Sequence, residues 1–380
     1  MGAFSMKPSS KRRVLLVGAG HAHLEFIKSW RASDHELAEF TLITPHAHAI
    51  YSGLLPAYLL GEVRRSEIQI DLQSLAERRG IRLQLGRLRS LSIEHRHIVL
   101  ADGESMEFDD LFINTGGHTP TNWQSTAPRC LHVKPLSSFL DLWEQEANTI
   151  QRIAIIGAGA AGIEIAASLS QTASAKGKRE VHLIEGGAAL GLQLSGYWLS
   201  RYWQRRIQGQ LNKLGVHLHL NTQIIGLPRH PELALGETRM KFDLILAATP
   251  TEPPQFNIDQ VEQPMPVDSR LQVNMPTKTA NTKPRVWIAG DCISKSPWPR
   301  SGVSAVRQGQ ALRSLWHESI TTRNATERKF HLKPQRPQLK LLRMGDAAFG
   351  IWGKYSLGMS RLWLRLKSWI DGRYMQSFQR

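Results

Sequence analysis

Two nearly identical segments, about 140 residues apart, constrain the fold of this chain more than any other feature. Residues 13–20 are Arg-Val-Leu-Leu-Val-Gly-Ala-Gly, and residues 152–159 are Arg-Ile-Ala-Ile-Ile-Gly-Ala-Gly. Each is a short apolar run and a glycine-rich turn followed by a helical pattern, which is the opening of a βαβ unit that binds a dinucleotide. The glycines allow a tight turn and let a pyrophosphate approach the amino terminus of the helix. We therefore expect an α/β fold with two Rossmann-like dinucleotide-binding domains.

The second glycine turn is the more complete of the two. Gly157, Gly159 and Gly162 follow an expected strand and open an expected helix, and Glu185 ends the next strand. An acid at that place is suited to accept hydrogen bonds from the adenosine ribose and to repel a 2′-phosphate. We therefore predict that NADH binds here, with NADPH less favoured. The alternative is a glycine-rich turn that only packs a helix on a sheet.

The first glycine turn lacks the third glycine and is interpreted through its surroundings. One later apolar strand ends in Thr-Gly, another ends in Gly-Asp, and a helical segment begins soon after the second. That combination is typical of an FAD domain, in which the Asp binds the ribityl chain and the helix amino terminus faces the flavin pyrimidine. One departure is the sequence Thr44-Pro45-His46 after the second strand, where an acid usually holds the FAD ribose. The candidate FAD contacts are Gly18, Gly20, His21, His23, Thr115, Gly116, Gly290, Asp291, Gly302 and Val303.

Together these residues resemble the two-dinucleotide-binding flavoprotein family, the pyridine nucleotide-disulfide oxidoreductase-like proteins, and in particular type II NADH dehydrogenases. Five further segments look like the FAD-dependent domain that is fused to selenide, water dikinase in some bacteria; they are residues 20–23, 51–56, 133–135, 302–308 and 369–375. The resemblance implies that NADH passes a hydride to FAD and that the electrons then leave to a quinone or another small acceptor. We expect a discontinuous FAD domain, residues 1–120 and 275–330, with an NAD(P)H domain inserted at 121–274.

Glu164 is the candidate catalytic residue. It follows the second glycine turn in a Gly-x-Gly-x-x-Gly-x-Glu pattern and matches a glutamate that lies near the nicotinamide and the flavin in type II NADH dehydrogenases. The resemblance implies a role in proton handling, and the alternative is an acid that only stabilises the helix through its dipole. In the same relatives two glutamines line the quinone site, and Val303 and Arg307 stand at those places here. The identity of the acceptor therefore stays open.

Most of the net charge of +16 lies in the last fifty or so residues. From Arg328 onward there are twelve Lys or Arg residues against Asp346 and Asp371. Apolar residues recur at helical spacing from Met359 to Phe378, so the segment 331–380 is expected to contain a basic amphipathic helix. Such a helix is typical of a protein that lies on a membrane surface, and the alternative is a docking face for a partner.

The remaining sequence features limit where the protein can be located in the cell and which partners it can bind. No run of about 18 apolar residues occurs, and Cys130 and Cys292 are 162 residues apart in the sequence, which disfavours a redox-active pair. We expect a cytoplasmic protein, with the inner face of the cell membrane as an alternative location, and no bound metal. Two rival functions are a soluble reductase for a selenium, sulfur or protein acceptor, and a nucleic-acid-binding flavoprotein. Nucleic acid is the less favoured partner because no recognition motif accompanies the charge, and the oligomeric state stays open.

Overall fold

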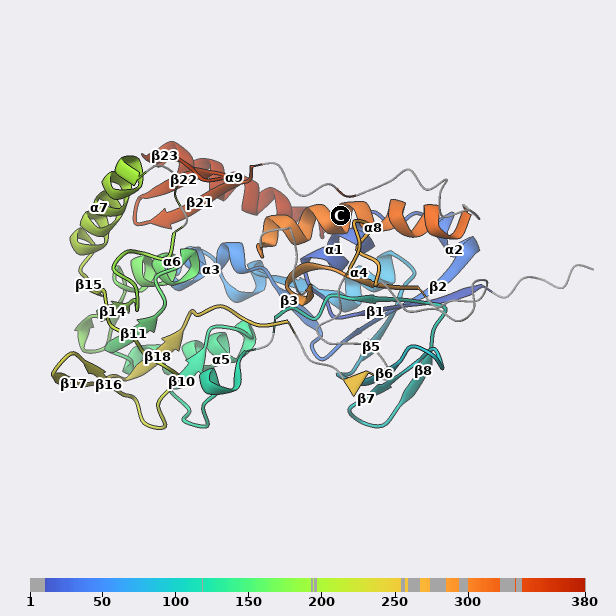
Figure 1. Ribbon diagram of the computed structural model, residues 1–380, viewed down its shortest axis with the longest axis horizontal. Helices are drawn as coiled ribbons and strands as arrows, with labels where there is room; N and C mark the ends of the chain where they lie inside the picture. Colours follow the sequence, from blue (N-terminus) through green and yellow to red (C-terminus); the bar gives the residue numbers. More distant parts are fainter. Residues whose placement is uncertain are drawn as a thin grey trace, which may run out of the picture. The chain divides into compact units, whose positions relative to one another are not determined.

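The computed structural model describes residues 11–117, 119–192, 194, 197–253, 257–258, 267–273, 285–293, 300–321, 332 and 337–379 (Figure 1). The chain forms two compact units, each assembled from separate stretches of sequence. Unit 1 comprises Met1–Ala49, Asp71–His118 and Glu252–Gln335, and unit 2 comprises Ile50–Ile70, Thr119–Thr251 and Arg336–Arg380. The central stretch of unit 2 is Thr119–Thr251, whereas the expected inserted domain is 121–274, and unit 2 also takes in residues 50–70 and the carboxyl-terminal segment.

Unit 1 is built on a five-stranded parallel sheet in the order β20-β9-β1-β2-β5. The strands are β1 (Arg12–Val17), β2 (Ala38–Thr44), β5 (Arg82–Leu85), β9 (Asp110–Ile113) and β20 (Arg285–Ile288). The central strands β1 and β9 are runs of buried apolar residues, as expected for a parallel sheet covered on both faces. In Figure 1, α1 (His21–Lys28) and α8 (Gly302–Thr321) lie side by side above this sheet. Their close approach requires Gly309, because a Cβ there would lie 2.3 Å from the carbonyl oxygen of Ala22.

Smaller elements complete unit 1 (Figure 1). A second sheet in the order β19-β6-β7-β8 consists of β6 (Leu88–Ser92), β7 (His97–Leu100), β8 (Ser105–Glu107) and β19 (Asn257–Ile258). The helices α2 (Asp34–Leu37) and α4 (Leu72–Arg78) precede β2 and β5, and the short strands β3 (His48–Ile50) and β4 (Gln69–Asp71) flank the segment that belongs to unit 2.

Unit 2 repeats the same parallel sheet in the order β10-β18-β11-β14-β15. Its strands are β10 (Cys130–His132), β11 (Arg152–Ile156), β14 (Glu180–Ile184), β15 (Val216–His219) and β18 (Leu244–Ala247). Its helices are α3 (Leu55–Leu59), α5 (Leu136–Glu146), α6 (Ala160–Leu169) and α7 (Tyr197–Lys213). Two hairpins, β12 (Ala173–Ser174) with β13 (Gly177–Lys178) and β16 (Glu232–Leu235) with β17 (Thr238–Lys241), are added to it. The expected α/β fold with two Rossmann-like halves is confirmed.

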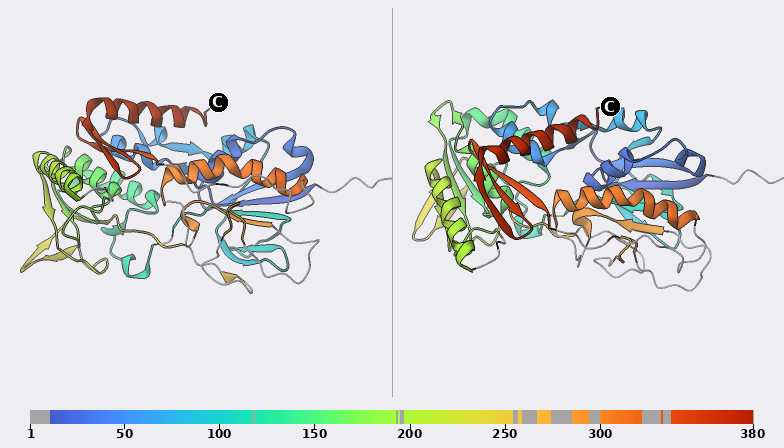
Figure 2. Two further views of the ribbon diagram at one scale, coloured as in Figure 1. Left: turned by 45° about the horizontal axis from the view of Figure 1, so that its top comes forward. Right: turned by 90° about the horizontal axis from the view of Figure 1, so that it is seen from above.

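The carboxyl-terminal part of unit 2 contains a sheet that the sequence analysis did not predict. The strands β21 (Leu339–Met344), β22 (Ala347–Trp352) and β23 (Tyr355–Ser360) pair antiparallel, and α9 (Arg361–Gln376) packs on β22 (Figure 2). Gly345 and Gly353 have φ of 75° and 63° in the two hairpin turns, a conformation that favours glycine.

The expected helix α9 is present, but its faces differ from the expected pattern. Met375 and Phe378 are buried, whereas Leu362, Trp369 and Ile370 are exposed. Lys367 and Asp371 point instead into the protein. In the part of the chain that the structure describes, no helix has the length and apolarity needed to cross a bilayer.

Candidate functional site

The glycine turn of unit 2 links β11 to α6 at the carboxyl end of the sheet. Gly157 has a φ of 102°, and a Cβ on Gly162 would lie 1.9 Å from the Gly157 carbonyl oxygen. These two glycines are therefore required by the backbone itself. Gly159 differs, because nothing lies within 4 Å of a Cβ placed there, and it precedes the first turn of α6 without a side-chain cap. An open space beside an uncapped helix amino terminus is where a pyrophosphate can approach.

Glu185 follows β14 and lies beside this turn. Its Oε2 accepts a hydrogen bond from Ala158 N at 2.8 Å, and its Oε1 accepts one from Gly187 N at 3.2 Å. The loop after Glu185 is held by Gln204 of α7, whose buried side chain bonds both Leu190 N and Leu190 O. The carboxylate is therefore positioned at the edge of the turn, and its role as a ribose-binding acid stays a prediction.

A groove lies against the same loop, between it and α7. Its lining combines the arginines Arg201 and Arg205 with Ala188, Gln204 and Leu220. The two arginines make the lining of this groove positively charged, and a positive groove attracts anionic groups such as phosphates.

The glycine turn of unit 1 depends on Asn114, a residue that the sequence analysis did not single out. Its Oδ1 accepts hydrogen bonds from the Ala22 and His23 amides, and its Nδ2 donates to Ala289 O at 2.8 Å. A Cβ on Gly20 would lie 2.3 Å from Asn114 Oδ1. One buried amide therefore caps α1 and joins the ends of β9 and β20, which explains why the turn needs small residues.

The two predicted histidine contacts differ in burial. His21 is partly exposed at the start of α1. His23 is fully buried, and its Nδ1 lies 2.6 Å from the carbonyl oxygen of Gly18. Burial lowers the pKa of His23 to about 4, so the ring is neutral and Nδ1 donates to Gly18. The structure thus places His23 beneath the turn, where it supports the backbone of Gly18.

The other candidate FAD contacts of unit 1 gather at the ends of β9 and β20. Gly116 has a φ of 82° with open space around it, and Gly290 has a φ of 72°. Gly290 N donates to Gln308 Oε1 at 2.7 Å, so a buried glutamine of α8 holds the strand end that carries Asp291. Thr115 is exposed, Asp291 is half-buried, and Gly302 and Val303 lie exposed at the amino terminus of α8.

The two cysteines are free and buried. Cys292 Sγ donates to Gly116 O at 3.2 Å and lies 3.4 Å from Thr115 Oγ1. Burial raises the pKa of both Cys130 and Cys292 to about 11, so each thiol is protonated at neutral pH. Neither is a thiolate nucleophile, and Cys292 packs against the candidate FAD contacts.

Glu164 faces the carboxyl-terminal segment of unit 2. Its Oε1 accepts a hydrogen bond from Arg343 N at 2.8 Å and lies 3.8 Å from Lys367 Nζ. Lys367 also bonds Asp371 Oδ2 at 3.1 Å, and Tyr51 donates its hydroxyl proton to Asp371 Oδ1 at 2.8 Å. Residues distant in sequence thus form one chain of charged and hydrogen-bonding groups within unit 2.

The protonation of Glu164 is set by opposing effects. Burial raises its pKa, while Lys367 and the Arg343 amide oppose that rise. Burial likewise acts against the charged form of Lys367, but Glu164 and Asp371 outweigh it and raise the pKa of the ammonium. A carboxyl group that is desolvated and paired with a cation can hold or release a proton in response to charge nearby.

The two parallel sheets and their glycine turns define the class of protein. Each unit has a positive-φ glycine at its first βα turn and backbone close enough to exclude a Cβ, which fits a dinucleotide in each. This is a two-dinucleotide-binding oxidoreductase. Residues 12–309 match the pyridine nucleotide-disulphide oxidoreductase family, and the chain belongs to that family. It is an FAD-dependent NAD(P)H oxidoreductase.

Known proteins resemble the chain at low sequence identity. A nitric oxide reductase FlRd-NAD(+) reductase from Citrobacter koseri is 24% identical, covering 74% of this chain and 72% of that protein. The demethylphylloquinone reductase NdbB from Synechocystis is 23% identical, covering 57% and 56%. The structure of NDH2 from Plasmodium falciparum with NADH has a TM-score of 0.72 at 14% identity, covering 97% of both chains. The chain thus spans just over half of the Synechocystis protein, and the structural likeness concerns the fold.

Proposed function

We propose that the protein oxidises NADH at unit 2 and passes the electrons through FAD to a quinone. The observation that supports this most is that both units contain the same kind of glycine turn. At the turn of unit 2, the acid Glu185 accepts a hydrogen bond from the amide of Ala158. Gly157, Gly159 and Gly162 would hold the nicotinamide dinucleotide, and Gly18, Gly20, Gly290 and Asp291 the flavin. The flavin supplies hydride acceptance and onward electron transfer, so the protein supplies position and electrostatics.

The role proposed for Glu164 is to hold a proton next to the ammonium of Lys367 while charge changes at the cofactors. Its contact with Lys367 supports this, because the ammonium favours the carboxylate and burial favours the acid. The balance between these effects lets the group respond to reduction and reoxidation.

A quinone is proposed as the acceptor on two grounds. The Synechocystis relative is a demethylphylloquinone reductase. In addition, α9 exposes Leu362, Trp369 and Ile370 beside the cations Arg365 and Arg373. This combination suits the headgroup region of an anionic bilayer. Quinones dissolve in the apolar interior of such a bilayer. We propose that the protein works at a membrane surface on the cytoplasmic side.

The second candidate is a soluble reductase for a protein or for a sulfur or selenium compound. The Citrobacter relative is named nitric oxide reductase FlRd-NAD(+) reductase. In addition, Val303 and Arg307 replace the two glutamines expected at a quinone site. The narrower resemblance to the domain fused to selenide, water dikinase stays a prediction and belongs to this candidate.

An anaerobic titration of the FAD-loaded protein with NADH, and separately with NADPH, tests the proposal. We expect NADH to bleach the flavin absorbance near stoichiometry, with NADPH less effective, and a menaquinone analogue to restore it. Bleaching that no quinone reverses would favour the soluble acceptor, and absence of bleaching by either nucleotide would refute the reductase function.

A further inference from the structure

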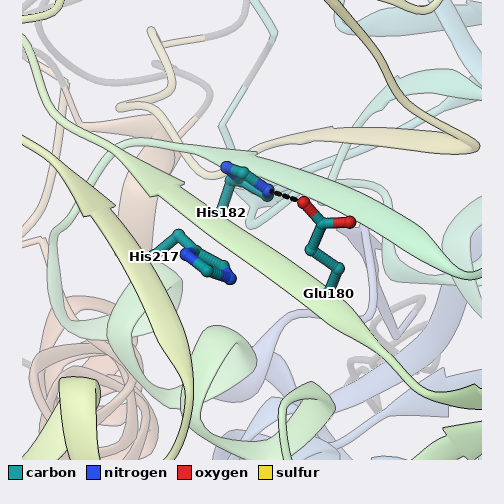
Figure 3. A group of neighbouring side chains, drawn as sticks. All are labelled: Glu180, His182 and His217. Atoms are coloured by element: carbon teal, nitrogen blue, oxygen red, sulfur yellow. Dashed lines mark hydrogen bonds and ion pairs between the residues drawn. The ribbon is translucent and has the colours of Figure 1, made fainter.

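Apart from the glycine turn, three histidines and an acid gather on one face of the unit 2 sheet. Glu180 and His182 are two residues apart on β14, so both side chains point to the same face. His217 lies opposite His182 in the parallel register of β15, and His219 follows two residues later. Pairing of a Glu-x-His segment with a His-x-His segment therefore brings potential metal ligands together, of which Figure 3 shows Glu180, His182 and His217.

The distances within this group suit a metal ion. Ligand atoms of Glu180, His182 and His217 all lie within 4.8 Å of one another. His182 Nε2 is 2.9 Å from Glu180 Oε1, and Figure 3 shows the two side chains pointing at each other with the His217 ring stacked beside His182. Ligand atoms of a tetrahedral Zn²⁺ site lie about 3.3 Å apart, so modest side-chain rotations would close the site.

The surrounding residues orient these ligands. His182 Nδ1 lies 2.9 Å from His219 Nε2, a contact that directs the other ring nitrogen towards Glu180. Arg152 Nε bonds Glu180 Oε2 at 2.7 Å, which leaves Oε1 on the histidine side. Hydrogen bonds of this kind, made to the atoms that do not ligate, fix ligand geometry in metal sites.

We propose that Glu180, His182 and His217 bind a divalent transition-metal ion, of which Zn²⁺ matches the ligands best. Imidazole and carboxylate ligands suit Zn²⁺, and three protein ligands leave the fourth position to water. His217 is exposed and offers a route of entry, while Phe242 packs edge-on against the His182 ring.

The ion would join β14 to the edge strand β15 and stabilise the sheet. Glu180 begins β14 and Glu185 follows its end, so about 16 Å separates the metal ligand from the proposed ribose acid. The metal site is therefore distinct from the nucleotide site. This proposal departs from the expectation of no bound metal. The two segments are 35 residues apart in the sequence, and the structure shows that they pair.

Zinc binding to the untagged, full-length, chelator-treated protein tests this proposal. We expect calorimetry to show one Zn²⁺ per chain and the melting temperature of the protein to rise with Zn²⁺. Co²⁺ in the same site should give the visible absorption of tetrahedral coordination. His217→Ala should weaken Zn²⁺ binding about tenfold or more and remove the thermal shift. Glu180→Gln keeps an acceptor for His182 without the charge and should also weaken binding.

The matched control is His230→Ala, which removes another exposed histidine of unit 2 and should leave zinc binding unchanged. Equal Zn²⁺ binding by the His217 and His230 variants would overturn the proposal. The same holds if the unaltered, chelator-treated protein fails to bind one added Zn²⁺ per chain. The readouts are metal content and melting temperature, so the result does not depend on the proposed reductase function.

Discussion

At the scale of single residues, buried amide side chains hold backbone segments at the candidate cofactor sites of both units. Asn114 and Gln308 do so in unit 1, and Gln204 holds the loop after Glu185 in unit 2. A buried amide that satisfies one or more backbone groups is costly to replace, because its partners are left without hydrogen bonds. Asn114 and Gln204 belong to no segment singled out in the sequence, and Gln308 ends the segment 302–308, so only the contacts show which backbone each amide holds.

His23 leads to a pH-dependent stability. Its pKa is lowered by burial to about 4, and its Nε2 is buried with no hydrogen-bond partner among the described residues, so protonation is unfavourable in the folded state. The unfolded chain binds the proton at a pH below about 6.5. The stabilisation is thus fully present above pH 6.5 and is lost as the pH falls towards 4, by about 3 kcal/mol in total.

The measurement is denaturant unfolding between pH 4 and 7. In His23→Asn the amide can still donate to Gly18 O, and we expect a shallower loss of stability over this range. Parallel pH profiles for the two proteins would contradict the assignment.

Glu164 is the residue that tests proton handling. We expect Glu164→Gln to retain FAD but to lower the steady-state turnover about a hundredfold, the lower end of general acid-base contributions, and to flatten its pH profile. Lys367→Met should move the pH profile without abolishing turnover, because it removes the cation that opposes protonation of Glu164. A Glu164→Gln enzyme with normal turnover and an unchanged profile would leave Glu164 with only a structural role.

At the scale of elements, the glycines in the turn between β11 and α6 have two different functions: Gly162 is needed for the backbone to pack, and Gly159 leaves space for the ligand. Gly162→Ala forces a Cβ to within 1.9 Å of a backbone oxygen, so we expect a lower melting temperature. Gly159 has φ of −73° and open space, so Gly159→Ala should leave the melting temperature unchanged. Its methyl group would occupy the proposed approach of the pyrophosphate and should raise the KM for NADH at least tenfold. Normal NADH kinetics in Gly159→Ala would exclude this turn as the nucleotide site.

At the scale of the whole molecule, the net charge of +16 and the exposed apolar residues of α9 predict binding to anionic membranes. We expect the protein to sediment with vesicles that contain phosphatidylglycerol and to be released by salt, because ions screen the attraction. The double variant Leu362→Ala/Trp369→Ala should bind less. Ile225→Ala, which truncates an exposed apolar residue outside α9, is the control and should bind normally. Equal sedimentation of all three proteins would show that α9 is not the membrane contact.

Much of this architecture follows from the sequence because its signals are local. Glycine turns, apolar strands and helical periodicity predict β1, α1, β11, α6 and their sheets, since each depends on residues adjacent in the chain. Strand pairing, burial and ring stacking depend on residues far apart. Only the tertiary structure therefore revealed the β21–β23 sheet, the inward-facing Lys367 and Asp371 of α9, the role of Asn114 and the group around His182. Local patterns in the sequence determined the two dinucleotide folds, whereas long-range packing decided the surroundings of Glu164, because it brings this half-buried acid against the side chain of Lys367.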